Sequence, residues 1–442
     1  MTTTGPAWVQ DAIWWHVYPL GFVGAERAAA PDQPVVHRLG HLAGWLDHAV
    51  ELGASGLALG PVFASETHGY DTTDHLRVDP RLGDDADLDT LVAACHERGL
   101  RVLLDGVFNH VGRSHPAFRA VLEQGPSAPT ASWFRLRWPE GGWRPGTEPR
   151  YDDFEGHSAL VALDHDEPAV ADHVVEVMTH WLDRGVDGWR LDAAYAVPTS
   201  FWAGVADRVR ERHPDAYLMG EVIHGDYAGF VAGAHLDAVT QYELWKAVWS
   251  SLNDANFFEL DAALARHGQF LDAFVPFTFL GNHDVTRIAS RLTDERHLAH
   301  ALVVLLTTGG TPAVYAGDEH AFRGVKEDRA GGDDAVRPPF PASPAELSPL
   351  GLPTFSLHRE LIGLRRRNRW LHTARTTTLH LANEQLVYEA VGDGQRLVVA
   401  LSVGDRPAEI PAKGADRVLA GDAEVAGGRV RLPAHGWAVL EG

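Results

Sequence analysis

Short apolar runs alternate with longer amphipathic stretches along most of the chain. The runs are brief and are bordered by Gly or Pro, which is typical of parallel strands that are buried on both faces. The stretches between them repeat Leu, Val or Ala at helical spacing. We expect helices at 39–52, 88–98, 170–184, 201–212 and 355–367. We expect strands at 13–18, 56–59, 102–105, 188–192, 217–221, 238–242, 277–281 and 312–315.

This order of elements predicts an α/β fold in which eight strand–helix units close into a (β/α)8 TIM barrel. Gly99 and Gly185 follow two of the expected helices at the position of a C-terminal cap, which supports these helix ends. An open, doubly wound sheet is the structural alternative, but eight units exceed the number that such a sheet usually contains. We therefore favour the barrel.

Two segments depart from the alternation. Residues 111–165 follow the third strand and contain several Trp, Gly and Pro, so we expect a small subdomain that is inserted over one face of the barrel. Towards the C-terminus the pattern changes to short alternating runs between Gly-Asp and Gly-Gly turns, which is typical of antiparallel sheets. We divide the chain into a first barrel part at 1–110, the insert at 111–165, a second barrel part at 166–373 and a C-terminal antiparallel β-sandwich domain at 374–442.

Composition excludes several classes of partner. The chain has 442 residues, with 38 Lys and Arg against 60 Asp and Glu, and a formal net charge of −22. Such an acidic surface repels phosphate backbones and anionic lipid headgroups, so we expect no nucleic-acid partner and no membrane partner. The apolar runs also fall short of the roughly 18–20 residues that a membrane span needs.

Cysteine usage bears on the compartment. Cys95 is the single cysteine, which excludes an intramolecular disulfide and a Cys-based zinc site. Residues 1–11 contain no cationic residue and no apolar core of a secretory signal. We therefore expect a cytoplasmic location.

Carboxylates gather where the expected strands end. Asp105, Asp192 and Glu221 stand at the ends of the third, fourth and fifth strands, and Asp284 follows the seventh. The active site of a (β/α)8 barrel lies at these carboxyl ends. Acidic side chains are rarely buried in such numbers without a cation or a reaction that compensates for their desolvation.

Two kinds of chemistry fit this pattern. A divalent metal could bind the carboxylates, with His110 and His283 as nitrogen ligands. Alternatively, one carboxylate acts as a nucleophile and another as an acid on an acetal. Arg190 lies two residues before Asp192, so both side chains point to the same side of a strand, and the guanidinium can keep the carboxylate charged. This detail favours chemistry on a sugar.

Several motifs stand in order at the expected strand ends. They are DGVFNH at 105–110, GWRLD at 188–192, GE at 220–221 and NHD at 282–284, flanked by HGYDTTD at 68–74 and VDPRLGD at 78–84. Together they resemble the motifs of the α-amylase family of glycoside hydrolases, and the resemblance extends from about residue 12 to the C-terminus. Within that family the chain is most similar to the neopullulanase and cyclomaltodextrinase group.

The resemblance implies a role for each motif residue. Asp192 corresponds to the nucleophile, Glu221 to the general acid and base, and Asp284 to the residue that stabilises the transition state. Arg190 corresponds to the partner of the nucleophile. Further substrate contacts are implied for His110 and His283 with sugar hydroxyls, Tyr70 with a sugar ring and Arg337 on the donor side, whereas Asp105 supports the strand end.

The chain also departs from the group. Tyr195 and Ile223, followed by His224, replace residues that commonly line the acceptor side. Asn109 matches a calcium ligand of secreted amylases, but the segment 21–34 offers few oxygen ligands, so calcium is not favoured. We expect no cofactor and no bound metal. The N-terminal β-domain that usually precedes the barrel of this group is missing, so we expect a monomer or a homodimer rather than the domain-swapped dimer.

These observations predict a retaining hydrolase of α-1,4 links, and of some α-1,6 links, in small or cyclic maltooligosaccharides. The reaction would be a double displacement through a covalent glycosyl-enzyme intermediate. A cyclic maltosyl-maltose with mixed links is one hypothesis for the substrate, because Tyr195 and Ile223 alter the acceptor side. A transglycosylase or glucanotransferase, or an exo-acting α-glucosidase, could use the same site. A non-catalytic sugar-binding protein is disfavoured because all three catalytic carboxylates are present.

Overall fold

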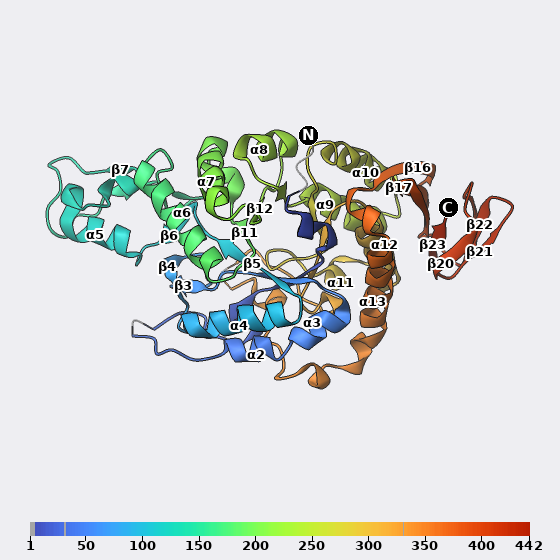
Figure 1. Ribbon diagram of the computed structural model, residues 1–442, viewed down its shortest axis with the longest axis horizontal. Coiled ribbons are helices and arrows are strands. Elements are labelled where there is room, and N and C mark those ends of the chain that lie inside the picture. Colours follow the sequence, from blue (N-terminus) through green and yellow to red (C-terminus); the bar gives the residue numbers. More distant parts are fainter. Residues whose placement is uncertain (1–4, 31, 330) are drawn as a thin grey trace.

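Eight parallel strands form the central sheet of the computed structural model, which describes residues 5–30, 32–329 and 331–442. Their order in the sheet is β13-β12-β11-β5-β2-β1-β15-β14, and the pairing of Thr240 with Phe277 joins the two edges. The strands are β1 (Trp14–Val17), β2 (Gly56–Leu59), β5 (Arg101–Gly106), β11 (Gly188–Leu191), β12 (Tyr217–Gly220), β13 (Ala238–Val239), β14 (Phe277–Phe279) and β15 (Thr311–Tyr315). The predicted (β/α)8 barrel is confirmed (Figure 1).

Each barrel strand is buried on both faces, which explains why it appears in the sequence as a short apolar run. Side chains such as Trp14, Ala58 and Leu103 belong to an apolar cluster inside the barrel. Alternate residues such as Trp15 and Leu57 belong to the larger core between the strands and the helices. Apolar side chains therefore fill the inside of the barrel, beneath the polar residues at the strand ends.

Helices surround the sheet. The helix α4 (Asp85–Glu97) begins with a capping box between Asp84 and Asp87. The longer outer helices are α6 (Pro168–Asp183), α7 (Thr199–Arg212), α9 (Tyr242–Asn253), α10 (Phe258–Phe270), α12 (Leu298–Thr307) and α13 (Leu352–Arg367), and the shorter ones are α1 (Pro19–Phe22), α8 (Tyr227–Ala234) and α11 (Ile288–Arg291). Among the described residues, no helix is long and apolar enough to cross a membrane.

The expected helix at 39–52 is instead two helices, α2 (Leu39–Ala43) and α3 (Leu46–Leu52). The break falls at Gly44 and Trp45, where the Trp45 amide bonds to the Leu42 carbonyl three residues back. The Trp45 ring is fully buried and stacks on Trp15 at 6.3 Å between ring centroids. Packing of one large ring therefore overrides the helical periodicity here.

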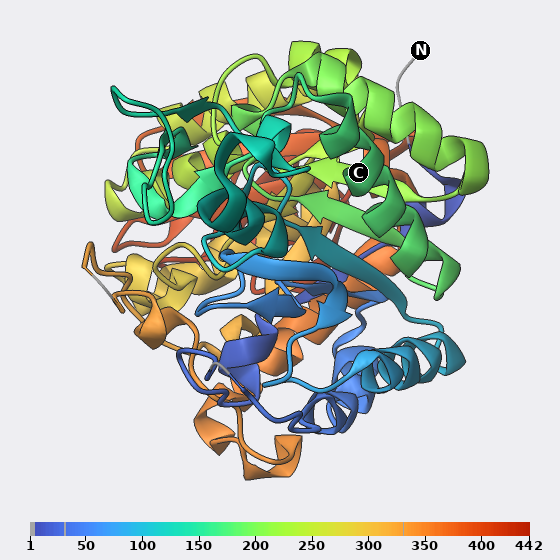
Figure 2. The ribbon, with the colours of Figure 1, turned by 90° about the vertical axis from the view of Figure 1, so that its left-hand side faces the viewer.

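The insert after the third barrel strand forms one end of the molecule (Figure 1), and Figure 2 shows it in front of the barrel. It contains α5 (Pro116–Gln124), the three-stranded sheet of β6 (His110–Gly112), β10 (His157–Ala162) and β9 (Asp153–Phe154), and the pair of β7 (Leu136–Arg137) and β8 (Arg150–Tyr151). A further antiparallel pair, β3 (Phe63–Ser65) and β4 (Thr72–Val78), follows β2. Both segments lie on the side of the barrel where the strands end.

The C-terminal part is antiparallel, as the sequence predicted, and lies at the opposite end of the molecule (Figure 1). Its larger sheet consists of β16 (Arg375–Ala382), β17 (Gln385–Gly392), β18 (Gln395–Ser402), β23 (Trp437–Glu441) and β20 (Arg417–Gly421). Its smaller sheet consists of β19 (Ala408–Pro411), β22 (Arg429–Leu432) and β21 (Glu424–Ala426). Apolar residues of both sheets, including Val398 and Val430, form one buried cluster.

Gly188, at the start of β11, provides a test of this packing. A Cβ atom at this position would lie 2.2 Å from the Tyr217 carbonyl oxygen of the neighbouring strand. We expect Gly188→Ala to lower the free energy of unfolding by about 1–3 kcal/mol, since overpacking forces a backbone shift. The control Gly204→Ala, in an exposed position of α7 with open space around the added Cβ, should raise it by about 0.5–1 kcal/mol. Equal melting temperatures of the two variants would contradict this account.

Candidate active site

The polar strand ends meet at one mouth of the barrel. Asp105 and Arg190 belong to β5 and β11, whose pairing places them side by side in register. Asp192 follows β11 directly, and Glu221 follows β12 directly. Because adjacent parallel strands end together, their last side chains converge. The structure thus brings together the carboxylates that the sequence separates.

Arg190 lies at the centre of this mouth. Its Nη1 atom is 2.7 Å from both carboxylate oxygens of Asp105 and 3.2 Å from Oδ1 of Asp192. Its Nη2 atom is 2.7 Å from Oε1 of Glu221. The sequence indicated Asp192 as the partner of Arg190, whereas the structure shows shorter contacts to the other two carboxylates. The guanidinium occupies the space where a metal ion between these carboxylates would lie.

Glu221 is held by groups that the sequence analysis did not identify. The Tyr242 hydroxyl donates to Glu221 Oε1 at 3.1 Å, and the Ala193 backbone amide donates to Oε2 at 3.1 Å. Asn282 in turn donates to the Tyr242 hydroxyl at 2.9 Å. Asn282 lies in the NHD motif, and Tyr242 stands at the end of the strand expected at 238–242, a position that could have indicated it. The carboxyl group of Glu221 is therefore fixed in orientation.

Asp284 lies between His283 and Arg337. Its Oδ2 atom is 2.8 Å from His283 Nε2, and Arg337 donates to Oδ1 at 2.8 Å. Burial alone would raise the pKa of Asp284, but His283, Arg337 and Arg190 together hold it well below its usual range. Its side chain is 32% exposed, compared with 10% for Asp192. Asp284 is thus an ionised carboxylate that faces the open side of the mouth.

Asp192 differs from Asp284 in its electrostatics. Burial raises the pKa of Asp192 well above its usual value, Arg190 opposes this rise, and the carboxylates of Glu221 and Asp105 reinforce it. Burial raises the pKa of Asp105 as well. One guanidinium is shared by three carboxylates, so Arg190 opposes the rise in the pKa of Asp192 without cancelling it. Groups that interact this strongly titrate together.

His283 is enclosed by aromatic rings. Tyr70 stacks on one face with centroids 5.3 Å apart, and Tyr18 stacks on the ring at 5.7 Å. The Tyr70 hydroxyl contacts His283 Nε2 and donates to Asp105 Oδ2 at 3.0 Å. His283 has no exposed surface, so a contact with a sugar hydroxyl would require a neighbouring side chain to move. Tyr18, at the end of β1, was missed by the sequence analysis although its position at a strand end could have indicated it.

His110 is also buried and fully hydrogen-bonded. Its Nε2 atom donates to the Tyr70 carbonyl at 3.0 Å, and its Nδ1 atom is 3.0 Å from the Asn109 amide nitrogen. Its ring stacks on Phe154 of the insert with centroids 4.8 Å apart. Burial lowers the pKa of His110 to about 4, so the ring is neutral at pH 7. This histidine joins the insert to the loop that carries Tyr70.

Tyr195, one of the predicted acceptor-side residues, lies at a groove between the insert and the barrel. The Tyr195 hydroxyl donates to Glu155 Oε1 at 2.8 Å. Both residues line this groove together with Phe154. Ile223 is 41% exposed and His224 is exposed, both in the loop between β12 and α8. Glu155 could not be anticipated, because the contact joins residues from two separate parts of the chain.

Comparisons with known proteins identify the family of the chain. Residues 16–346 match the model of the alpha amylase catalytic domain. A cyclomaltodextrinase from Bacillus sp is 35% identical over 341 residues, which cover 72% of this chain and 61% of that protein. The chain thus spans less than two thirds of the length of this relative.

Two solved structures are similar over nearly the entire chain. The cyclic alpha-maltosyl-(1→6)-maltose hydrolase from Arthrobacter globiformis, in complex with that sugar, has a TM-score of 0.84 and 25% identity, covering 99% of this chain and 100% of that one. The debranching enzyme of Nostoc punctiforme, soaked with acarbose, has a TM-score of 0.82 and 26% identity, covering 100% of both chains. With the barrel, its insert and the match to the catalytic-domain model over residues 16–346, the chain belongs to the α-amylase family.

Proposed function

We propose that the chain is a retaining α-glucoside hydrolase that cleaves small or cyclic maltooligosaccharides. The observation that carries the proposal is the contact of Arg190 with both Asp192 and Glu221 through its two terminal nitrogens. Contact with one guanidinium brings the two carboxylates near one another, as the short spacing of retaining glycosidases, about 5–5.5 Å, requires.

The proposed reaction uses each carboxyl group once in each half. Asp192 attacks the anomeric carbon while Glu221 gives its proton to the departing glycosidic oxygen, and a glycosyl-enzyme ester forms. Glu221 then takes a proton from water, the water oxygen displaces Asp192 and the sugar leaves with its original anomeric configuration. Ionised Asp284 stabilises the positive charge that develops on the sugar ring.

The acceptor groove supports a small or cyclic substrate. The hydrogen bond between Tyr195 and Glu155 joins the insert to the barrel at the groove, and Ile223 offers an exposed apolar surface in the loop between β12 and α8. The full-length similarity to a hydrolase of a cyclic maltosyl-maltose supports the same substrate class. We therefore propose a cyclic maltosyl-maltose with mixed 1,4 and 1,6 links as the preferred substrate.

The experiment compares four substrates at equal glucose concentration: this cyclic sugar, cyclodextrins, pullulan and starch. Proton NMR follows both the rate and the anomer that forms first. We expect the cyclic tetrasaccharide to react at least about tenfold faster than starch, a difference of about 1.4 kcal/mol in transition-state binding. The product should first appear as the α-anomer. Rapid starch cleavage without activity on cyclic sugars would overturn the substrate proposal, and a β-anomer would overturn the mechanism.

A further inference from the structure

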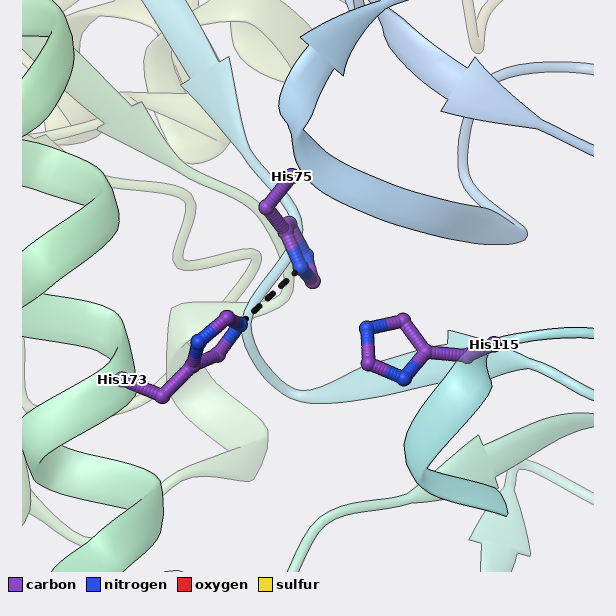
Figure 3. A group of neighbouring side chains, drawn as sticks. All are labelled: His75, His115 and His173. Atoms are coloured by element: carbon purple, nitrogen blue, oxygen red, sulfur yellow. Dashed lines mark hydrogen bonds between the residues drawn. The ribbon is translucent and has the colours of Figure 1, made fainter. Parts of the chain in front are cut away.

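Three histidines from separate elements meet at the root of the insert, away from the catalytic carboxylates. His75 belongs to β4, His115 caps the N-terminus of α5, and His173 belongs to α6. Figure 3 shows the three rings around one small space. One ring nitrogen from each lies within 4.8 Å of the other two. His75 and His115 are buried, and His173 is partly buried.

The distances suit a tetrahedral metal ion. His173 Nε2 and His75 Nδ1 are 3.4 Å apart. Two nitrogens bound to one tetrahedral Zn²⁺ at about 2.1 Å each would lie about 3.4 Å from one another. A hydrogen bond between these two rings would explain their approach, but it would not explain His115. The Nδ1 atom of His115 accepts a hydrogen bond from its own helix. Figure 3 shows that the other ring nitrogen of His115 points towards His75 and His173.

The His75 ring is held in the tautomer that a metal ligand needs. Its Nε2 atom donates to the Val107 carbonyl at 2.8 Å, so the lone pair of Nδ1 points into the cluster. A ring N–H bound to a backbone carbonyl is the usual outer partner of a metal-bound histidine. Val107 follows the strand that carries Asp105. The ring is therefore positioned before any ion arrives.

The charges around the cluster also suit a dication. Burial lowers the pKa of His75, His115 and His173, so all three are neutral at pH 7 and do not repel one another. The carboxylates of Glu176 and Asp74 lie near enough to His173 to act on it electrostatically. Together they can balance the two positive charges of a bound ion. Three imidazoles without an oxygen ligand exclude Ca²⁺ and Mg²⁺, which bind oxygen.

Two existing hydrogen bonds would have to break. The Ala117 amide donates to His115 Nδ1 at 3.2 Å, so the proton of the neutral ring now lies on Nε2. Metal binding at Nε2 moves this proton to Nδ1 and removes the cap. The hydrogen bond between His173 Nε2 and His75 Nδ1 is likewise replaced by bonds to the ion. Zn²⁺ binds structural sites tightly enough to outweigh both losses.

We propose that His75, His115 and His173 bind one Zn²⁺ ion, with water as the fourth ligand. The ion would join β4, the start of the insert and α6, and would so fix the insert on the barrel. This proposal differs from the expectation from sequence that the chain holds no metal. Three histidines at positions 75, 115 and 173 form no recognisable spacing motif, so the sequence did not indicate the site.

The test measures metal binding by the full chain, without reference to activity. Protein dialysed against a chelator is titrated with Co²⁺, whose visible absorption reports tetrahedral nitrogen coordination, and then with Zn²⁺, which should displace it. We expect one ion per chain and a higher melting temperature with Zn²⁺. His115→Asn keeps an N-cap acceptor and His173→Gln keeps a good helix former, so both variants should fold.

Each of these two variants should weaken Zn²⁺ binding by about 100-fold or more, since even loss of an outer partner costs 10–100-fold. The control His180→Gln removes a partly buried histidine from the same helix, outside the cluster, and should bind one ion like the parent. Far less than one Zn²⁺ per parent chain at micromolar concentration would overturn the proposal. Undiminished binding by the double variant His115→Asn/His173→Gln would overturn it too. If a variant does not fold, the Co²⁺ spectrum of the parent still decides, because six-coordinate surface binding absorbs weakly.

Discussion

Asp192→Asn will reduce turnover of a maltooligosaccharide by about 10⁴-fold or more, because the amide cannot form the glycosyl ester that divides the reaction into two easier steps. The amide still accepts a hydrogen bond from Arg190, which is 3.2 Å from the present carboxylate, so the fold should persist. KM should change much less than kcat. Steady-state kinetics on the substrate that reacts fastest will measure this loss.

A matched control lies on the same barrel segment. Asp187 precedes β11 at the opposite end of the barrel, where it accepts from the Val102 amide at 2.8 Å. Asp187→Asn should leave turnover within about threefold of the parent, although it weakens an ion pair with Arg101 that is worth less than about 1 kcal/mol. Turnover of Asp192→Asn within tenfold of the parent would show that Asp192 is not the nucleophile.

Glu221→Gln will lower turnover of the natural substrate by about 10²–10⁴-fold, the usual contribution of a general acid. A glutamine amide has one accepting oxygen, so it can keep the hydrogen bond from the Ala193 amide or the one from the Tyr242 hydroxyl, but not both. It cannot give a proton to the departing oxygen. Adding Asp192→Asn to this variant should cause little further loss, because residues that act in the same step are not additive.

A change of leaving group distinguishes the loss of the acid–base role of Glu221 from a loss of activity through misfolding. An α-maltosyl fluoride needs no proton on its leaving group. In Glu221→Gln the rate of the first half of the reaction should therefore fall much less with this fluoride than with a glucan. The second half then lacks its base, and added azide, which needs no base, should restore turnover and give an α-glycosyl azide. An equal loss on the fluoride and the glucan, without rescue by azide, would contradict an acid–base role.

The barrel could be predicted because its strands are buried on both sides and remain visible as short apolar runs. The errors lie where tertiary contacts end an element. The predicted strand at 238–242 stops at Val239, and Gln241 caps α9 by accepting from the Leu244 amide at 3.3 Å. The apolar pattern continues through this transition, so it does not mark the point where the strand becomes a helix. The cytoplasmic location and the monomer or homodimer remain predictions.

The site was predictable where a residue's role follows from its place on a strand. The alternation of side chains placed Arg190 and Asp192 on one side, as observed. It could not show that Arg190 lies closer to Asp105, since this depends on the register between β5 and β11. The contact between Glu155 and Tyr195 depends on how a long insert folds back over the barrel. Sequence spacing contains no information on either distance.

The closure of the barrel has a consequence for heat inactivation. Among the residues that the structure describes, a single bridge, between Thr240 and Phe277, joins the sheet into a ring, next to a strand of only two residues. Such a short seam opens with less free energy than the rest of the ring. Tyr242, which orients Glu221, begins the helix that leaves this seam. Local opening there would release Glu221 while the other strands remain paired, so activity would be lost at a temperature below that at which the chain unfolds.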